Sequence, residues 1–299
     1  MSIYRLHIRP KGGKANVKTV FNYCLNHNIL GVGWRITDSI EEVTWEEYSK
    51  KAKEFFGKID TVNYLKNRIK PNDLIWTRDE LGDYYLAKVK SKWKYFNTLE
   101  ANEKDIDIAN TVEVDFLKIP TSEVPGKVIA CFRPTRTLQA INSDFVREYS
   151  KYLWNEKSSI NKFDDFSYKL ENIFDFIDSE ELEDLLFVYL QINNFIVVPN
   201  SRKADTMSYE YFAIDKKTKI NHLVQIKSGN TSLDLKNYQK TKEHYILFQS
   251  NDLYHNESLQ NEKIKILRRK QLEEFMKNDF EYLPKVIQNK ITKINKTNG

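Results

Sequence analysis

The sequence is poor in cysteine and glycine and has no long apolar run. Its 299 residues include 2 cysteines and 9 glycines. Cys24 and Cys131 form no Cys-x-x-Cys pair, which excludes a cysteine-rich zinc site and fits a reducing compartment. No stretch approaches the roughly 18 apolar residues of a membrane span, and residues 1–13 lack the apolar core of a signal peptide. We therefore expect a cytoplasmic protein without a membrane partner.

Several sequence motifs of hydrolases and nucleotide-binding proteins are also missing. The five histidines show no HxH, HExxH or HNH pattern, so zinc hydrolase and HNH nuclease chemistry are unsupported. The glycine-rich run at 31–36 is not followed by the Gly-Lys-Ser/Thr of a phosphate-cradling loop, which excludes a P-loop. The chemistry must therefore come from other residues.

The length and composition are those of a soluble protein with two domains. A chain of 299 residues with 40% hydrophobic and 30% charged residues can form two cores. A formal charge of +5 permits a polyanionic partner without demonstrating one. Pro120, Pro125 and Gly126 punctuate the chain after a predicted strand at 111–119, so we place the boundary between 118 and 150.

The stretch 179–229 contains the clearest pattern in the chain. Leucines and Tyr189 recur at helical spacing, which predicts a helix from Ser179, as its N-cap, to about Asn193. Three runs rich in β-formers follow, and they predict strands at 195–198, 209–214 and 222–226, the last two as a hairpin.

Four polar residues of this stretch are expected to meet. Glu183 lies on the predicted helix and Glu210 enters the second strand. Gln225 and Lys227 are two residues apart and therefore point to the same face of the third strand. A carboxylate, an amide oxygen and an ammonium are what metal-assisted phosphodiester hydrolysis needs: ligands for Mg²⁺ or Mn²⁺ and a cation for the developing charge. The main-chain carbonyl of Ile226 is a further possible ligand.

This combination resembles the Mrr-like branch of the PD-(D/E)XK nuclease superfamily over about residues 165–270. LEDLLFVYLQINNF resembles the family's helix-to-strand entry, YEYFAID its metal-binding strand and VQIKSG its (D/E/Q)-x-K strand. The resemblance implies that Glu183 is the helix acid, Glu210 the metal acid, Gln225 the second metal ligand and Lys227 the catalytic lysine. The family more often has Asp in a glycine-rich turn at the first strand, so Asp205 is the alternative metal acid. Gln225, in place of the Asp or Glu common in the family, gives the site one negative charge fewer, and this replacement also marks weakened or inactive sites.

The N-terminal part resembles PUA-like domains, including the EVE and related base-sensing barrels, over roughly residues 1–118. The resemblance depends on GVGW at 31–34, a helix at 45–56, the strands PNDLIWTR and YYLAKV, and Trp93. It implies an aromatic pocket that holds a base extruded from a nucleic acid, because aromatic faces stack on any base. The aromatic candidates are Trp34, Trp76, Tyr84, Tyr85 and Trp93. The alternative is that most of these rings simply fill the core of the barrel.

Together these interpretations predict an α+β protein. We expect a PUA-like β-barrel with helices at 1–118, a connector at 119–164, and a restriction-endonuclease-like mixed sheet flanked by helices at 165–299. The resemblances imply a Mg-dependent endodeoxyribonuclease of a restriction system, acting in antiviral defence, with DNA and a second copy of the chain as partners. Its first domain would recognise a modified base. The alternatives are a non-catalytic nucleic-acid-binding protein, a nucleotide sensor, and a nuclease directed to RNA.

Overall fold

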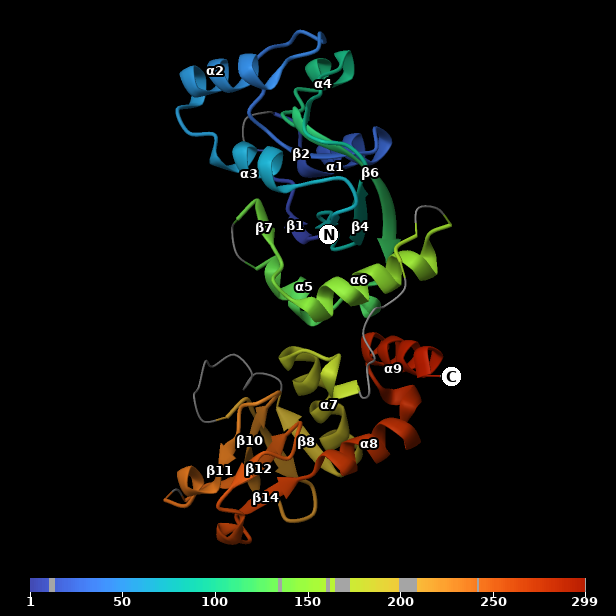
Figure 1. The fold of residues 1–299 in the computed structure, drawn as a ribbon. Helices are drawn as coiled ribbons and strands as arrows, with labels where there is room; N and C mark the ends of the chain where they lie inside the picture. The colour runs from blue at the N-terminus through green and yellow to red at the C-terminus, as the bar shows by residue number, and fades with distance from the viewer. Residues whose placement is uncertain are drawn as a thin grey trace. The chain divides into compact units, whose positions relative to one another are not determined.

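The computed structural model divides the chain into two compact units, Met1–Phe166 and Ser167–Gly299. Both units combine helices with a mixed sheet, which confirms the α+β class (Figure 1). None of the described helices has the length and apolar character needed to cross a membrane. The structure describes residues 1–10, 14–133, 136–159, 162–164, 173–198, 209–240 and 242–298.

The first unit is built on one curled sheet. Its strands follow the order β2-β6-β4-β3-β1-β7, with the short β5 paired to β6. The pair β1–β3 is parallel and the other pairs are antiparallel. The strands are β1 (Ile3–Leu6), β2 (Ile29–Val32), β3 (Leu74–Arg78), β4 (Tyr84–Val89), β5 (Lys94–Tyr95), β6 (Asn110–Ile119) and β7 (Leu138–Ala140).

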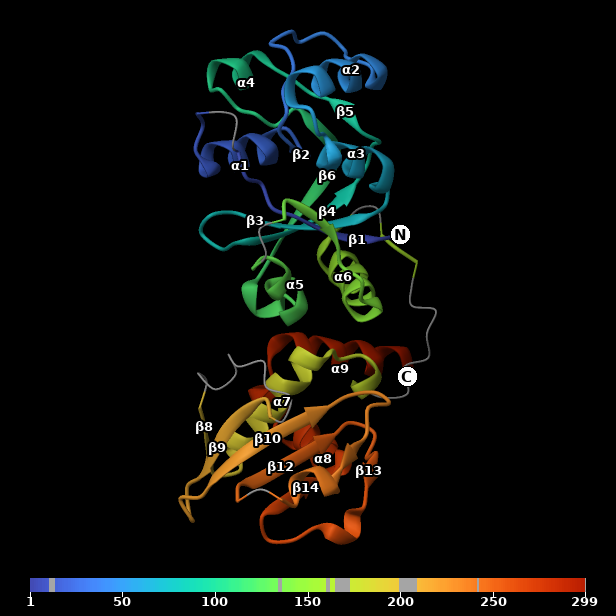
Figure 2. The same ribbon diagram turned by 90° about the vertical axis from the view of Figure 1, so that its left-hand side faces the viewer.

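Helices cover both faces of this sheet (Figure 2). Apolar residues of four of them, among them Phe21, Tyr48 and Leu65, form one core with Leu6 and Ile75 of the sheet. On the opposite face the α6 helix packs against β3. The helices are α1 (Val17–Asn26), α2 (Trp45–Phe56), α3 (Asp60–Arg68), α4 (Leu99–Glu103), α5 (Gly126–Cys131) and α6 (Asp144–Lys157).

The segment 119–164, expected as a connector, contains regular structure. It includes α5, β7 and α6, and β7 pairs antiparallel with β1. The Trp76 indole N–H donates to Ser150 Oγ of α6 at 3.0 Å in a fully buried contact. The segment therefore belongs to the first unit. Prolines and Gly126 indicate only local breaks in the chain, whereas the pairing of β7 depends on the distant edge of β1.

Local sequence signals explain where α2 begins and ends, and a close contact between strands explains the glycine at position 31. Thr44 and Glu47 form a reciprocal capping box at the start of α2, and Gly57 ends the helix at φ 71°. Gly31 lies where β2 meets β6, and a Cβ atom there would stand 2.3 Å from the carbonyl oxygen of Asn110. The helix at 45–56 is thus confirmed, and Gly31 permits a close strand contact.

The second unit contains a five-stranded sheet in the order β14-β12-β10-β9-β8. The pairs β8–β9 and β9–β10 are antiparallel, while β10–β12 and β12–β14 are parallel. A separate parallel pair joins β11 to β13. The strands are β8 (Phe195–Val198), β9 (Tyr211–Asp215), β10 (Asn221–Lys227), β11 (Leu233–Asp234), β12 (His244–Gln249), β13 (Tyr254–His255) and β14 (Ile264–Leu267).

The sheet of the second unit is apolar on both faces. In β12, Ile246 and Phe248 join the core beneath the helices, whereas Tyr245 and Leu247 join a smaller cluster on the opposite face. Such a strand has a continuous apolar sequence because both of its faces are buried. The helices are α7 (Ser179–Ile192), α8 (Arg269–Asn278) and α9 (Lys285–Asn298).

The start of α7 is held by a buried ionic network. Asp178, and not Ser179 as predicted, is the N-cap, and it forms a capping box with Glu181. Lys290 of α9 donates to both carboxylate oxygens of Glu181, at 2.9 and 2.6 Å, and to the carbonyl oxygen of Phe176 at 2.8 Å. Asp178 lies within the electrostatic influence of Lys290, but its Oδ2 is buried without a hydrogen-bond partner among the described residues. Burial, and then the charge of Glu181, raise the pKa of Asp178 to about 7.

The raised pKa of Asp178 predicts a pH-dependent stability of the second unit. The folded state binds the proton more tightly than the unfolded state, so this contribution is complete below pH 3.8 and is lost as the pH rises through about 7. Asn at this position keeps the cap without the charge. We expect Asp178→Asn to raise the unfolding free energy at pH 8 by roughly 2–4 kcal/mol, at about 1.4 kcal/mol per pKa unit.

The unfolding free energy of the second unit is measured by denaturant titration at several pH values between 4 and 8. The gain over wild type should shrink steadily towards pH 4. Asp279→Asn, which removes the same charge at the end of α8, should give a difference that does not follow this pH dependence. A gain for Asp178→Asn that is equal at every pH would contradict the prediction.

Candidate functional site

The register of β9 against β10 brings two of the predicted residues together. Tyr211 pairs with Val224, and the Glu210 N–H donates to the Val224 carbonyl oxygen at 2.7 Å. Glu210 therefore precedes β9 by one residue and lies opposite Gln225. The Gln225 amide nitrogen donates to Glu210 Oε1 at 3.4 Å.

Lys227 reaches the same carboxylate from the next position on that face of β10. Its ammonium nitrogen lies 3.5 Å from Glu210 Oε1, with side chains that are 35% and 26% exposed. Residues two apart on one strand both reach a residue on the neighbouring strand, one directly and one diagonally. The sequence prediction that these three residues converge agrees with this geometry.

Glu183 faces the same place from α7. With Glu210 and Lys227 it lines a cavity of about 140 Å³ at the end of β10. The remaining lining residues come from α7, from the end of β10 and from the loop after it: Ser179, Leu182, Ile226, Ser228 and Thr231. Tyr211 supports the helix at this point, because its hydroxyl donates to the Glu183 carbonyl oxygen at 3.4 Å. The cavity thus has two carboxylates and one ammonium in its wall, a net charge of −1.

The Gln225 amide oxygen provides a test of whether a cation fits this site. Gln225 is 1% exposed, and its Oε1 is a buried acceptor that has no hydrogen-bond partner among the described residues. A buried acceptor without a partner costs free energy, which a ligand can recover. Carboxylate and amide oxygens are the ligands that Mg²⁺ and Mn²⁺ prefer. The residues present therefore fit a hard divalent cation, although no group of three or more His, Cys, Asp or Glu side chains suited to a metal occurs in the described part of the chain.

Gln249 shapes the loop that borders the cavity, and the sequence analysis did not identify it. It is fully buried at the end of β12, beside Lys227 in the parallel pair. Its amide nitrogen donates to the carbonyl oxygens of Gly229 and Thr231 at 2.8 and 3.0 Å. Its amide oxygen accepts from the N–H groups of Asn251 and Leu253 at 2.6 and 3.0 Å. One side chain thus holds two loops, and only the register of β12 reveals this role.

Asp205, the alternative metal acid, lies outside the described residues. The geometry above therefore concerns Glu210 alone, and the choice between the two acids stays a prediction.

The aromatic residues predicted to bind a base are largely part of the first core. Trp76 is fully buried and Tyr84 is 4% exposed. Trp34, Tyr85 and Trp93 are half-buried and pack against the core of the first unit. The buried rings of Trp76 and Tyr84 fill the interior, which is the alternative that the sequence left open. Trp34, Tyr85 and Trp93 keep part of their surface exposed, and binding of a base by these three stays a prediction.

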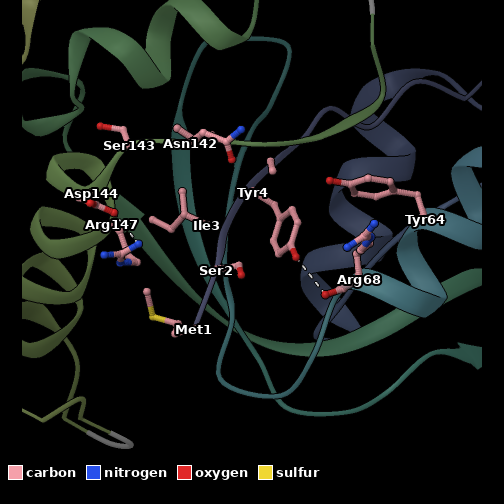
Figure 3. Close-up of a pocket in the computed structure, with 12 residues that line it drawn as sticks. Met1, Ser2, Ile3, Tyr4, Tyr64, Arg68, Asn142, Ser143, Asp144 and Arg147 are labelled. Carbon is pink, nitrogen blue, oxygen red and sulfur yellow. Dashed lines mark hydrogen bonds and ion pairs between the residues drawn. The ribbon is translucent and has the colours of Figure 1, made fainter.

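A larger cavity, of about 530 Å³, lies in the first unit between β1, α3 and the start of α6 (Figure 3). Tyr4, Tyr64 and Arg68 face it from one side, and Asp144 and Arg147 from the other. The rings of Tyr4 and Tyr64 meet edge to face with centroids 6.3 Å apart, and the Tyr4 hydroxyl donates to the Arg68 carbonyl oxygen at 2.9 Å. Arg147 is paired with Asp144 at 2.7 Å. No motif marks this site, because its residues come from four separate elements.

Comparisons with known proteins give little beyond these observations. No family model matches the sequence. No curated protein matches it either. Among solved structures, the DNA modification-dependent restriction endonuclease AspBHI aligns with 99% of this chain and 85% of its own, at 11% sequence identity and a TM-score of 0.22. A TM-score this low does not establish a common fold, so the functional argument depends on the geometry of the site.

Proposed function

We propose that the protein is a metal-dependent restriction-type endonuclease that cleaves DNA phosphodiester bonds at the cavity formed by Glu183, Glu210 and Lys227. The observation that carries the proposal is the convergence of the Glu183 and Glu210 carboxylates and the Lys227 ammonium on one cavity. Beside this cavity, the buried Gln225 donates its amide nitrogen to Glu210, and its Oε1 has no hydrogen-bond partner among the described residues. Oxygen donors of this kind are suited to a divalent cation. The order of helix, strand and hairpin around it supports the Mrr-like resemblance.

The residues of the chain would divide the work among themselves. Glu210 and Gln225 would hold the cation through their side-chain oxygens, with Glu183 as a further acid and the Ile226 carbonyl as a possible ligand. The bound Mg²⁺ or Mn²⁺ would supply a Lewis acid for the phosphate and lower the pKa of an attacking water. Lys227 would orient that water or stabilise the negative charge that develops on the phosphate. Its present contact with Glu210 keeps the ammonium at the cavity wall.

Recognition of DNA would belong to the first unit, and we propose that it uses the cavity beside Tyr64. A volume of about 530 Å³ is large enough for a small ligand of nucleotide size. The half-exposed Tyr64 ring offers a stacking surface, while Asp144 and Asn142 offer acceptors and a donor for the edge of a base. A modified base flipped from the duplex is the substrate that we propose. Cleavage of both strands needs two sites, so the proposal includes a homodimer.

One observation favours a second function, a non-catalytic nucleic-acid-binding protein. Glu210 Oε1 already has both the Gln225 amide and the Lys227 ammonium as neighbours, at 3.4 and 3.5 Å. A carboxylate that is satisfied by two donors can stabilise a fold without a metal. Both contacts are long for charge-assisted hydrogen bonds, which is why we prefer the catalytic proposal.

Removal of either charged partner should abolish cleavage. We expect Glu210→Gln and Lys227→Ala to reduce the rate of Mg²⁺-dependent DNA cleavage by about 100-fold or more, as is typical for loss of a group that stabilises the transition state. The rate is measured on plasmid DNA carrying modified or unmodified bases. Glu243→Gln and Lys216→Ala make the same changes at exposed positions near the opposite ends of the strands and should cleave like wild type. The proposed nuclease activity would be refuted if wild type and Lys227→Ala were equally inert on every DNA tested.

Binding of the cation should be visible without any cleavage. We expect Mn²⁺ or Mg²⁺ at millimolar concentration to raise the melting temperature of wild type, because a ligand that binds only the folded state stabilises it. Glu210→Gln removes a ligand charge and should reduce this rise. Glu243→Gln should show the rise of wild type. Equal shifts in all three proteins would contradict a site at Glu210.

Removal of the Tyr64 ring should weaken binding of DNA that carries the recognised base. Stacking of a base on an aromatic ring contributes about 1–3 kcal/mol, so Tyr64→Ala should lower the affinity roughly 5- to 150-fold. Tyr64→Phe keeps the ring and should bind within a few-fold of wild type. Phe55→Ala removes an exposed ring from α2 and serves as the control. Affinity is measured by fluorescence anisotropy in the absence of divalent metal, and identical affinities of Tyr64→Ala and Phe55→Ala would exclude this cavity.

A further inference from the structure

Two arginines flank one aromatic ring in the first unit, and the charges of two more act on the same place. We call Arg5, Arg9, Arg78 and Arg136 the arginine cluster. The guanidinium carbons of Arg5 and Arg78 lie 5.5 and 5.0 Å from the centroid of the Phe132 ring. The cluster is assembled from β1, the residues after it, the end of β3 and the segment before β7, so it exists only in the folded protein.

Arg5 is the fixed member of the arginine cluster. Its side chain is fully buried, which is rare for an arginine. The guanidinium donates to the carbonyl oxygen of Arg136 and to the Gln139 amide oxygen, the latter at 2.9 Å. Its Nε is a buried donor with no partner among the described residues. These contacts fix the Arg5 guanidinium through neutral oxygen atoms only. They therefore do not compensate its positive charge.

Arg78 and Arg136 are the members that a ligand can reach. Arg136 is exposed, and Arg78 is half-buried and donates to the Tyr84 hydroxyl at 3.4 Å. Arg9, also half-buried, donates from Nε to His7 Nδ1 at 3.2 Å and contributes its charge to the cluster. Guanidinium groups bind phosphate oxygens in a bidentate manner.

His7 reports the electrostatic field at this point. Burial, followed by the charges of Arg9, Arg78 and Arg5, lowers the pKa of His7 to about 4. All the charged groups that act on this ring are cationic. A field of one sign, held by a rigid scaffold, attracts a polyanion and is relieved by its binding.

We propose that the arginine cluster binds phosphate groups. Because the cluster extends over several arginines, it favours the phosphodiesters of a nucleic-acid backbone as the source of these phosphates. Free phosphate is the other source of the same chemistry. The choice of DNA as the nucleic acid rests on the proposed function, whereas the inference of a phosphate-binding site does not. The site would position the duplex without reading its sequence, because contacts to phosphates carry no sequence information.

The test measures binding of a fluorescent DNA duplex to the full chain at several salt concentrations, with EDTA present so that cleavage plays no part. We expect Arg136→Gln to lower the slope of log affinity against log salt by about 1, and Arg78→Gln with Arg136→Gln by about 2. Lys50→Gln with Lys51→Gln removes the same two charges from exposed positions on α2, which lies at the opposite end of the unit from α5 (Figure 2), and should keep the slope of wild type. Arg136 is exposed, so its single variant tests the site without disturbing the core.

A second readout uses His7 directly. The pKa of its ring, followed by NMR and assigned with His7→Gln, should rise by about 0.5 or more when DNA binds, since the bound phosphates offset the arginine charges. A rise with inorganic phosphate but not with DNA assigns the site to free phosphate. The proposal is overturned if neither anion moves the His7 pKa, or if the double arginine variant keeps the salt slope of the lysine control. These outcomes do not depend on cleavage, so a failed nuclease assay and a failed phosphate site are distinguishable.

Discussion

Pairing of β9 with β10 is the constraint on which the candidate site depends. The pairing of Tyr211 with Val224 sets Glu210 opposite Gln225 and puts Lys227 diagonally across from it. A shift of one residue would turn Gln225 and Lys227 to the opposite face, because side chains alternate along a strand. The register is determined by burial: Tyr211 and Val224 are fully buried in the core under α7. The polar site is therefore positioned by apolar packing on the other face of the same strands.

Support around the site comes from groups that do not touch the cavity chemistry themselves. The buried Lys290 and Glu181 hold the first turn of α7, two residues before Glu183. Gln249 holds the loop after Lys227 through four hydrogen bonds. Buried polar groups with satisfied hydrogen bonds, such as Lys290, Glu181 and Gln249, favour one arrangement of the chain around them. The acid on α7 and the lysine on β10 are thus each tied to a separate rigid element.

The two units differ in the sign of the charge that they gather. The cavity of the second unit has two carboxylates and one ammonium in its wall, which suits a cation. The first unit places Arg5 and Arg78 beside Phe132, and burial, followed by their charges together with that of Arg9, lowers the pKa of the neighbouring His7 to about 4. A net charge of +5 for the whole chain conceals this division. Local charge, and not the total, decides which ligand each surface attracts.

The sequence by itself determined several local elements and proposed the residues of the site. Helical spacing, the Thr44 cap and Gly57 correctly predicted α2 and the helix before the site, and the run of β-formers at 222–226 predicted the strand that carries Gln225. Only the tertiary structure decided that 119–164 belongs to the first unit, that Trp76 fills a core, and that Arg5 and Arg78 share one ring. The physical reason is the distance along the chain over which each kind of interaction acts. Caps and periodicity act within a few residues along the chain, whereas burial and charge clustering depend on contacts between segments that are far apart in sequence.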